Sequence, residues 1–111
     1  MKQLIDCREL SPIGTEDFPC FGAHHVFRSN DYHEKPYAFA LRVGIKDNKT
    51  MLVKIPISGE QSVQAEMLRK KFNTSYPVGV KFKNLRCFYY EYGNNTGFTA
   101  TADIFEILED S

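Results

Sequence analysis

Apolar and polar residues alternate most regularly between Tyr37 and Ile57. Period-two alternation is typical of a strand with one buried face. The alternation is interrupted once, at Asp47–Thr50, where Asp47 and Asn48 tolerate the left-handed backbone of a hairpin tip. The pattern therefore predicts a long β-hairpin whose buried face is formed by Tyr37, Phe39, Leu41, Val43, Ile45, Met51, Val53, Ile55 and Ile57.

The opposite face of this hairpin carries small and basic side chains: Ala38, Ala40, Arg42, Gly44, Lys46 and Lys54. Short side chains edged by positive charge allow a polyanion to approach the backbone closely. The alternative is an ordinary solvated face that happens to be basic.

The rest of the chain predicts further strands and one helix. Lys2–Leu10 reads as a strand or an extended arm, and residues 11–36 read mostly as loop with a short strand at His24–Arg28. Gln61–Phe72 has the spacing of an amphipathic helix, with Ser62 as its N-cap. The strand at Val78–Phe82 continues as Arg86–Tyr92 after a bulge or bend at Asn84–Leu85, and a last strand follows at Phe98–Leu108.

The order of these elements predicts a mainly β fold. A strand, a long loop, a hairpin, a helix and a second hairpin are the order of a five-stranded, antiparallel, OB-fold-like barrel, with one helix between strands 3 and 4. Other small α+β barrels share this order. We expect one domain over residues 1–111, with a long loop at 11–36 and a short acidic tail at 109–111.

The formal net charge is zero, but the charges are segregated along the chain. Residues 42–86 hold ten basic and three acidic side chains, whereas residues 87–111 hold five acidic side chains and no basic one. Such asymmetry is typical of a localised anion-binding surface. Alternatively, the acidic end folds back onto the basic middle.

Composition narrows the class of protein. The sequence contains no run of about 18 apolar residues, so we expect no membrane-spanning helix. The first residues carry charges, which are not typical of a signal peptide. Three cysteines without paired spacing fit reduced thiols, so we expect a cytoplasmic protein.

Basic residues run directly into aromatic ones along two predicted strands: Lys81, Lys83 and Arg86, then Phe88, Tyr89, Tyr90 and Tyr92. Cations hold phosphates and aromatic rings stack on bases, so this pattern favours single-stranded nucleic acid as the ligand. A strand carried beyond the rim of the barrel by the bend at Asn84 would expose both of its faces. The alternative is that Phe88 lies in the core and the tyrosines pack at the rim.

The loop at 11–36 also combines aromatic and basic residues. Arg28 and Tyr32 are candidates for nucleic-acid contact, while Phe18, Phe21 and Phe27 fit better as anchors of the loop to the core. Four potential zinc ligands follow the spacing C-x3-H-H-x7-H, which matches no common zinc motif: Cys20, His24, His25 and His33. We expect no metal, no other cofactor and, without a catalytic motif, no enzymatic activity.

Short segments of the second half resemble a known group of proteins. Val53–Ile55–Pro56, Val80–Phe82–Asn84 and Ala102–Asp103–Ile104 look like strand motifs of the small single-stranded-DNA-binding, helicase-processivity proteins of bacterial conjugative elements. The resemblance covers roughly residues 51–108. It implies an OB-type fold and single-stranded DNA as the ligand.

A second resemblance is to the single-stranded-DNA-binding proteins of filamentous phages. Lys35-Pro36-Tyr37 and Leu52–Ile55 look like the G-K-P-Y and L-V-K-I segments of that family, with Glu34 in place of its glycine. The resemblance implies that Lys35 and Tyr37 contact DNA, which conflicts with placing Tyr37 on the buried face.

The first hypothesis is a non-enzymatic, largely sequence-independent single-stranded-DNA-binding protein of a phage or mobile element. It would support replication or transfer beside a helicase or polymerase, and its small fold is compatible with a homodimer. The second hypothesis is a regulatory module that captures a host protein. The expected nucleic-acid contacts are Arg28, Tyr32, Lys35, Tyr37, Arg42, Lys46, Lys54, Lys81, Lys83, Arg86, Tyr89, Tyr90 and Tyr92.

Overall fold

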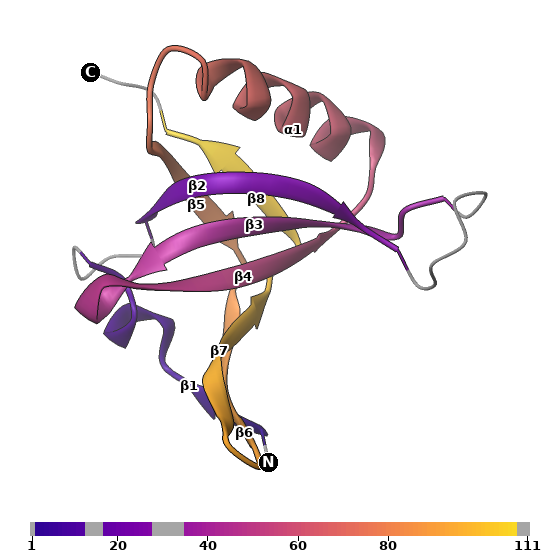
Figure 1. Cartoon of the computed structure of the whole chain (residues 1–111). Helices are drawn as coiled ribbons and strands as arrows, with labels where there is room; N and C mark the ends of the chain where they lie inside the picture. The colour runs from indigo at the N-terminus through magenta and orange to yellow at the C-terminus, as the bar shows by residue number, and fades with distance from the viewer. Residues whose placement is uncertain (1, 13–16, 28–34, 109–111) are drawn as a thin grey trace.

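Strands dominate the computed structural model of this chain, which describes residues 2–12, 17–27 and 35–108. This part of the chain contains eight β-strands, one α-helix and two short 3-10 turns (Figure 1). In chain order they are β1 (Lys2–Ile5), η1 (Cys7–Glu9), β2 (Asp17–Val26), β3 (Ala38–Ile45), η2 (Lys46–Asn48), β4 (Lys49–Pro56), α1 (Gly59–Lys71), β5 (Val78–Lys83), β6 (Arg86–Tyr92), β7 (Asn95–Thr101) and β8 (Ile104–Ile107).

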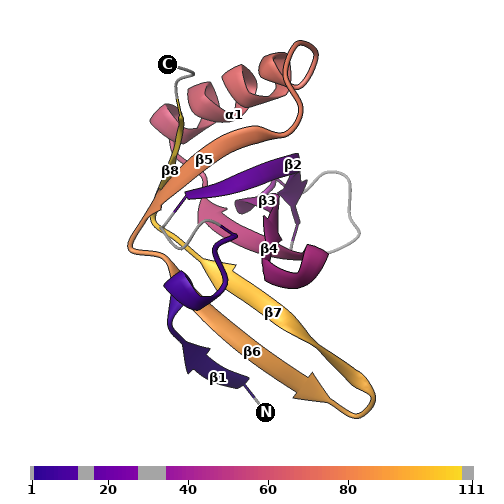
Figure 2. The same cartoon turned by 90° about the vertical axis from the view of Figure 1, so that its left-hand side faces the viewer.

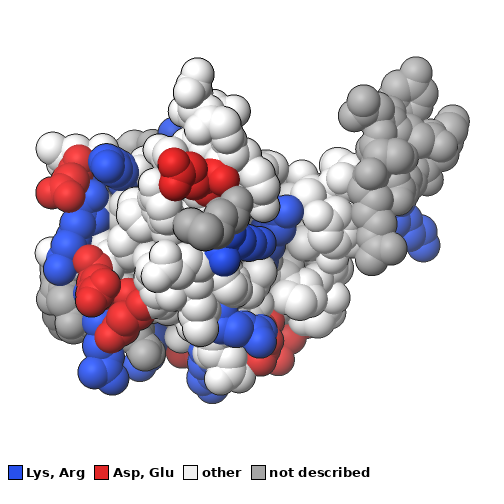
Figure 3. Space-filling view, turned by 90° about the horizontal axis from the view of Figure 1, so that it is seen from below, with Lys and Arg blue, Asp and Glu red and all other residues white. Residues whose placement is uncertain are grey.

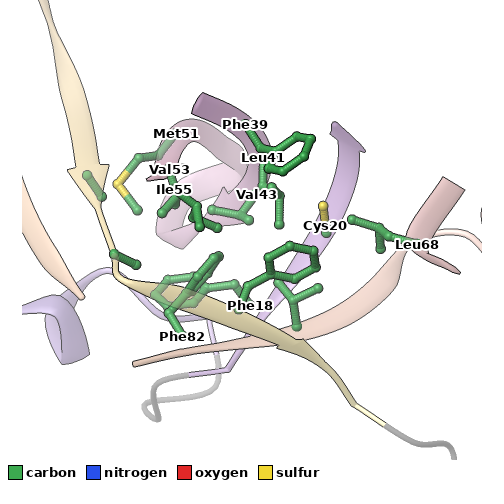
Figure 4. Packing of buried hydrophobic residues seen from close by; sticks show 14 of the residues in the cluster. Phe18, Cys20, Phe39, Leu41, Val43, Met51, Val53, Ile55, Leu68 and Phe82 are labelled. Atoms are coloured by element: carbon green, nitrogen blue, oxygen red, sulfur yellow. The ribbon is translucent and has the colours of Figure 1, made fainter. Parts of the chain in front are cut away.

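The predicted central hairpin is confirmed as β3 and β4. Asp47 and Asn48 at its tip have φ angles of 64° and 60°, the left-handed backbone that their side chains tolerate. The inner face of the hairpin is buried and packs against Phe18, Phe82 and Leu68 from other elements (Figure 4). Tyr37 is the exception: it precedes β3 and is 38% exposed, so its placement on the buried face is wrong.

Residues 17–26 form a ten-residue strand, so the prediction of a loop with a short strand at His24–Arg28 is wrong. β2 pairs with β3 on one side and with β5 on the other. Its register with β3 shifts between Cys20 and Gly22, which hides the period-two pattern in the sequence. Phe18 and Cys20 enter the core, and tertiary burial decides the conformation of this segment.

The helix begins earlier than the sequence indicates. Ser58, not Ser62, is the N-cap, and its Oγ accepts a hydrogen bond of 3.1 Å from the backbone N–H of Gln61. Gln61 is itself buried, and its Oε1 accepts a 2.8 Å hydrogen bond from the backbone N–H of Phe105. This bond fixes α1 against β8 and satisfies a buried donor.

Two bends lie side by side in the second half of the chain. The predicted bend between β5 and β6 is confirmed, and Asn84 there has a φ of 55°. The expected single strand Phe98–Leu108 is instead broken at Asp103, whose backbone N–H donates to the carbonyl of Lys83 (3.1 Å). The break shifts the alternation, so Phe105 is buried where unbroken alternation would bury Ile104.

The strands form one mixed sheet in the order β1-β6-β7-β4-β3-β2-β5-β8. β4 and β7 are parallel, and the other pairs are antiparallel. The mainly β class is confirmed, but the five-stranded antiparallel barrel is wrong, because the sheet has eight strands and does not close. The two bends split the last two expected strands into four, and β2 is a further strand in the segment expected to be mostly loop.

The strands divide between two regions. The body consists of β2–β5 and β8 with α1 packed against β8 and β2, and the projecting hairpin consists of β6 and β7 with β1 along its edge. The projecting hairpin extends from the body at the end away from α1 (Figures 1 and 2). No helix in the described part of the chain is long and apolar enough to cross a membrane.

Candidate nucleic-acid interface

One continuous surface crosses both regions. Strand register places its side chains in rows that run across β2, β3, β4, β7 and β6 on the side opposite the core. We call it the outer face. Its rows are His24, Ala40, Lys54, Thr101 and Arg86; then Gly22, Arg42, Leu52, Thr99 and Phe88; with Gly44 beside Thr50 and Gly97 beside Tyr90 at its end.

Small residues form much of the centre of the outer face, and larger cationic or aromatic groups lie around them. Ala40 is buried beneath its neighbours, the Phe21 ring covers Gly44, and Thr99 and Thr101 add little bulk. A ligand can therefore approach the sheet closely between the longer side chains. This is the small and basic face that the alternation of the central hairpin predicts.

Three hollows lie on the outer face or at its edge. The first is lined by Tyr37, Lys54, Arg86, Thr101 and Asp103 among others. The second is lined by His24, Arg42, Leu52, Tyr90 and Thr99 with their neighbours. The third lies between the tip of the central hairpin and the projecting hairpin, and is lined by Asn48, Lys49, Thr50, Tyr89, Tyr90, Thr96, Gly97 and Phe98.

The first hollow brings three predicted contacts together, although they are far apart in the sequence. Tyr37, Lys54 and Arg86 come from the end of the β2–β3 connection, from β4 and from β6. Arg86 lies 3.5 Å from a carboxylate oxygen of Asp103, and both side chains are more than half exposed. Such an exposed pair contributes little stability, so an incoming phosphate can replace the carboxylate.

The second and third hollows share Tyr90. Its ring lies over Gly97 on the neighbouring strand, so closely that a Cβ atom added to Gly97 would lie 2.7 Å from the Tyr90 hydroxyl oxygen. Tyr92 stacks on Tyr90 with ring centroids 6.3 Å apart and 30° between the planes. Because Gly97 has no side chain, the Tyr90 ring can pack flat against its backbone, in the same hollow as Arg42.

Aromatic side chains occupy both faces of the projecting hairpin. Tyr89 packs against Phe98 at 5.5 Å between centroids on one face. On the other face the ammonium of Lys2 lies 4.9 Å from the centre of the Phe88 ring. None of these rings is fully buried, so both faces of the projecting hairpin carry partly exposed aromatic groups.

Other predicted contacts lie elsewhere. Lys81 stands opposite Asp17 and Glu106 in the sheet, and the Lys83 ammonium lies 3.7 Å from Glu106 Oε1. Neither lysine lines the three hollows. Lys46 is exposed at the tip of the central hairpin, and Lys35 is exposed just before Tyr37. Arg28 and Tyr32 lie outside the described residues.

The charge pattern is partly self-complementary. Asp103 and Glu106 from the acidic end of the chain pair with Arg86 and Lys83 from its basic middle. Seen from below, basic and acidic side chains are interleaved with wide uncharged areas (Figure 3). The segregation of charge along the sequence therefore does not produce a single positive patch on the side of the molecule seen in Figure 3.

Three of the four candidate zinc ligands lie in the described part of the chain, and their side chains do not point toward one another. Cys20 points into the core, where burial raises the pKa of its thiol to about 11, and its Sγ donates to the carbonyl of Gly22 (3.3 Å). Burial also raises the pKa of Cys87. His24 lies on the outer face, whereas His25 packs on Phe39 on the opposite side. Residues 2–12, 17–27 and 35–108 contain no group of three possible metal ligands, and His33 lies outside them.

The hollows also contain residues that sequence reasoning did not select as nucleic-acid contacts, among them His24, Leu52, Phe98 and Lys49. Leu52 alternates with Met51 and Val53, so period two could have placed it on the outer face. Phe98 is on the core side of its strand by alternation, and only the projection of the hairpin beyond the core exposes it.

Comparison of the chain with protein-family models, with curated protein sequences and with solved structures finds no match. The functional interpretation therefore depends on the geometry of the outer face.

Proposed function

We propose that this chain is a non-enzymatic protein that binds single-stranded DNA along the outer face, largely independently of sequence. The observation that carries this proposal is the convergence of Arg42, Lys54 and Arg86 with Tyr37 and Tyr90 on one surface of small residues. Single-strand binders combine a cationic groove for the backbone with aromatic rings on which bases stack, and stacking tolerates every base.

The fold supports this proposal through the position of its loops. OB-type proteins bind oligonucleotides on the face of their second and third strands, between the loop before that pair and the loop before the last strand. In this chain the corresponding strands are β3 and β4. The turn between β6 and β7 and the end of the β2–β3 connection flank the outer face. We accordingly relate the curled, open sheet to the OB type.

Arg42, Lys54 and Arg86 hold phosphates in this proposal, and Tyr37 and Tyr90 stack on bases. The arrangement suits a cytoplasmic protein of a phage or mobile element that coats a displaced strand beside a helicase or polymerase, alone or as a homodimer. Duplex DNA offers no exposed base faces, so the aromatic rings contribute only when the ligand is single-stranded.

The test is fluorescence anisotropy with a labelled oligo(dT) and the matching duplex at low and at physiological salt. We expect tight single-strand binding, weak duplex binding and a linear dependence of log K on log salt. Tyr90→Ala should weaken single-strand binding by about 1–3 kcal/mol, and Tyr90→Phe should retain it because the ring remains. Absence of single-strand binding at low salt overturns the proposal.

A protein-binding module is the second candidate, and the exposed surface of α1 favours it. Val63 and Met67 stand four residues apart, so they share one helix face, and they are 60% and 46% exposed. A ligand-free protein that elutes from heparin at low salt and does not bind oligo(dT) would support this candidate over the first.

A further inference from the structure

A second aromatic cluster lies at the other end of the outer face, where α1 ends near β2. Phe21 of β2 and Phe72 at the C-cap of α1 both meet Tyr76, edge to face, with ring centroids 5.7 and 5.9 Å apart. Phe21 and Phe72 are half-buried, whereas Tyr76 is 61% exposed. An aromatic ring that only anchors a loop is normally buried by its partners. Tyr76 instead exposes much of its surface to solvent while it packs against the rings of Phe21 and Phe72.

Cations lie beside this cluster. Arg69, Lys70 and Lys71 form the last turn of α1, immediately before Phe72. Arg69 is three residues before Phe72, so the two share a helix face. Its guanidinium is 3.3 Å from Nδ1 of His25, which holds it on the side of the helix that faces β2. The cluster therefore has both groups that a nucleotide needs, an exposed ring and a positive charge.

Phe21 connects the cluster to the outer face. Its ring lies over Gly44 of β3, where an added Cβ atom would be 2.8 Å from a ring carbon. Gly44 pairs with Thr50 of β4, and Thr50 lines both hollows that contain Tyr90. From β2 to β6 the surface crosses four strand spacings, a span of roughly 19 Å. Tyr76 and Tyr90 thus stand at opposite ends of one uninterrupted path.

We propose that Tyr76, which contacts Phe21 and Phe72 edge to face and follows the basic last turn of α1, is a second base-stacking subsite that extends the path of single-stranded nucleic acid beyond the outer face. This inference rests on the proposed function. The occupant is a further base of the same strand that contacts Tyr90, with its phosphate near the end of α1. A short oligonucleotide fills the outer face alone, and a longer one reaches both ends.

The experiment compares oligo(dT) of about four and about sixteen nucleotides, the limits of the sizes of OB-type sites. Tyr76→Ala should weaken binding of the longer oligonucleotide about tenfold and leave the shorter one unchanged. Tyr90→Ala should weaken both. Tyr76→Phe should behave as the unmodified chain, and Val63→Ala, which removes an exposed apolar side chain of α1 away from the path, is the matched control.

A spectroscopic readout separates stacking from a loss of packing. The chain contains no tryptophan, so Tyr76→Trp introduces a unique indole fluorophore. Its emission should be quenched by the longer oligonucleotide and not by the shorter one, because only the longer one places a base on the ring.

The possible outcomes distinguish failure of the proposed subsite from failure of the proposed function. If Tyr90→Ala weakens binding while Tyr76→Ala has no effect at either length and the indole is not quenched, the subsite is wrong and the proposed function stands. An equal loss at both lengths for Tyr76→Ala also overturns the subsite, because it indicates a general structural effect. If neither oligonucleotide binds the unmodified chain, the proposed function fails and the subsite fails with it.

Discussion

The body and the projecting hairpin differ in how deeply they bury their aromatic side chains. β5 and β6 are consecutive segments that both combine basic and aromatic residues. In β5 the aromatic Phe82 is 2% exposed, and the outward Lys81 and Lys83 stand beside acidic residues. In β6 the aromatic residues remain partly exposed, and Tyr92 is 61% exposed.

The difference lies in what packs against each segment. β5 is paired on both edges, and its inner face lies in the core against β2 and β8 (Figure 4). β6 runs past the end of that core, and within β6 only Cys87, which faces Ala100, is fully buried. Whether an aromatic residue in these strands is buried or partly exposed therefore depends on its distance from the core.

The largest expected effect tests the burial half of this comparison. Phe82→Ala should lower the free energy of unfolding by about 3–5 kcal/mol, because it leaves a cavity among fully buried neighbours. Tyr92→Ala in the projecting hairpin should change it by less than about 0.5 kcal/mol. Urea denaturation measures both, and similar losses would show that the hairpin is as tightly packed as the body.

Alkaline pH should destabilise the body through Cys20. Burial raises its pKa from 9.0 to about 11 in the folded state, so the folded chain retains a proton that the unfolded chain loses. Stability is then complete below about pH 9 and falls between pH 9 and 11, by about 1 kcal/mol per pH unit for this thiol. Cys20→Ala should make the fall shallower in urea melts. An identical pH dependence in the variant would contradict the burial of this thiol.

A moderate effect is expected at the seat of Tyr90. Gly97→Ala places a Cβ atom 2.7 Å from the Tyr90 hydroxyl oxygen and 2.9 Å from the adjoining ring carbon, so the ring must leave its position. We expect a loss of about 1 kcal/mol in stability and weaker oligo(dT) binding.

Gly59→Ala is the matched control for this change. Gly59 is the first residue of α1, and an added Cβ atom there meets no atom within 4 Å. Alanine at this position should be neutral or slightly stabilising. Equal effects of the two glycine changes would show that Tyr90 does not depend on Gly97.

The smallest expected effect compares Lys54, a cation of the outer face, with Lys83, a cation of β5 outside that face. Lys54→Ala removes a cation from the first hollow and should lower the slope of log K against log salt by about 0.7. Lys83→Ala should lower it less, because Glu106 already neutralises this lysine. Anisotropy titrations at several salt concentrations give both slopes. A larger change for Lys83→Ala would place the binding surface on β5, outside the outer face.

Much of the local structure could be predicted from the sequence. Alternation placed the central hairpin, Asp47 and Asn48 placed its tip, and the interruption at Asn84 placed the first bend. These features depend on neighbours in the chain, and local propensity is sufficient to decide them. β2 was missed because a bulge and two turn-forming residues, Pro19 and Gly22, disguise a strand that exists only through its partners on both sides.

The candidate site divides in the same way. Arg42, Lys54 and Tyr90 could be selected from residue type and alternation, and the structure brings them together with Tyr37 and Arg86. Lys81 and Lys83 were selected on the same grounds but stand beside acids that come from distant segments. Proximity of this kind depends on register between strands, which the sequence of one strand does not contain.

The sequence by itself determined the class of the fold, the two faces of β3 and β4 and the residue types available for binding, because periodicity and side-chain chemistry are local properties. Tertiary structure alone decided that the sheet stays open, that the chain bends at Asp103, and which aromatic rings remain at the surface. Those outcomes depend on contacts between segments that are far apart in the sequence. The core does not bury every apolar side chain, and which ones it buries is decided only when all the strands have paired.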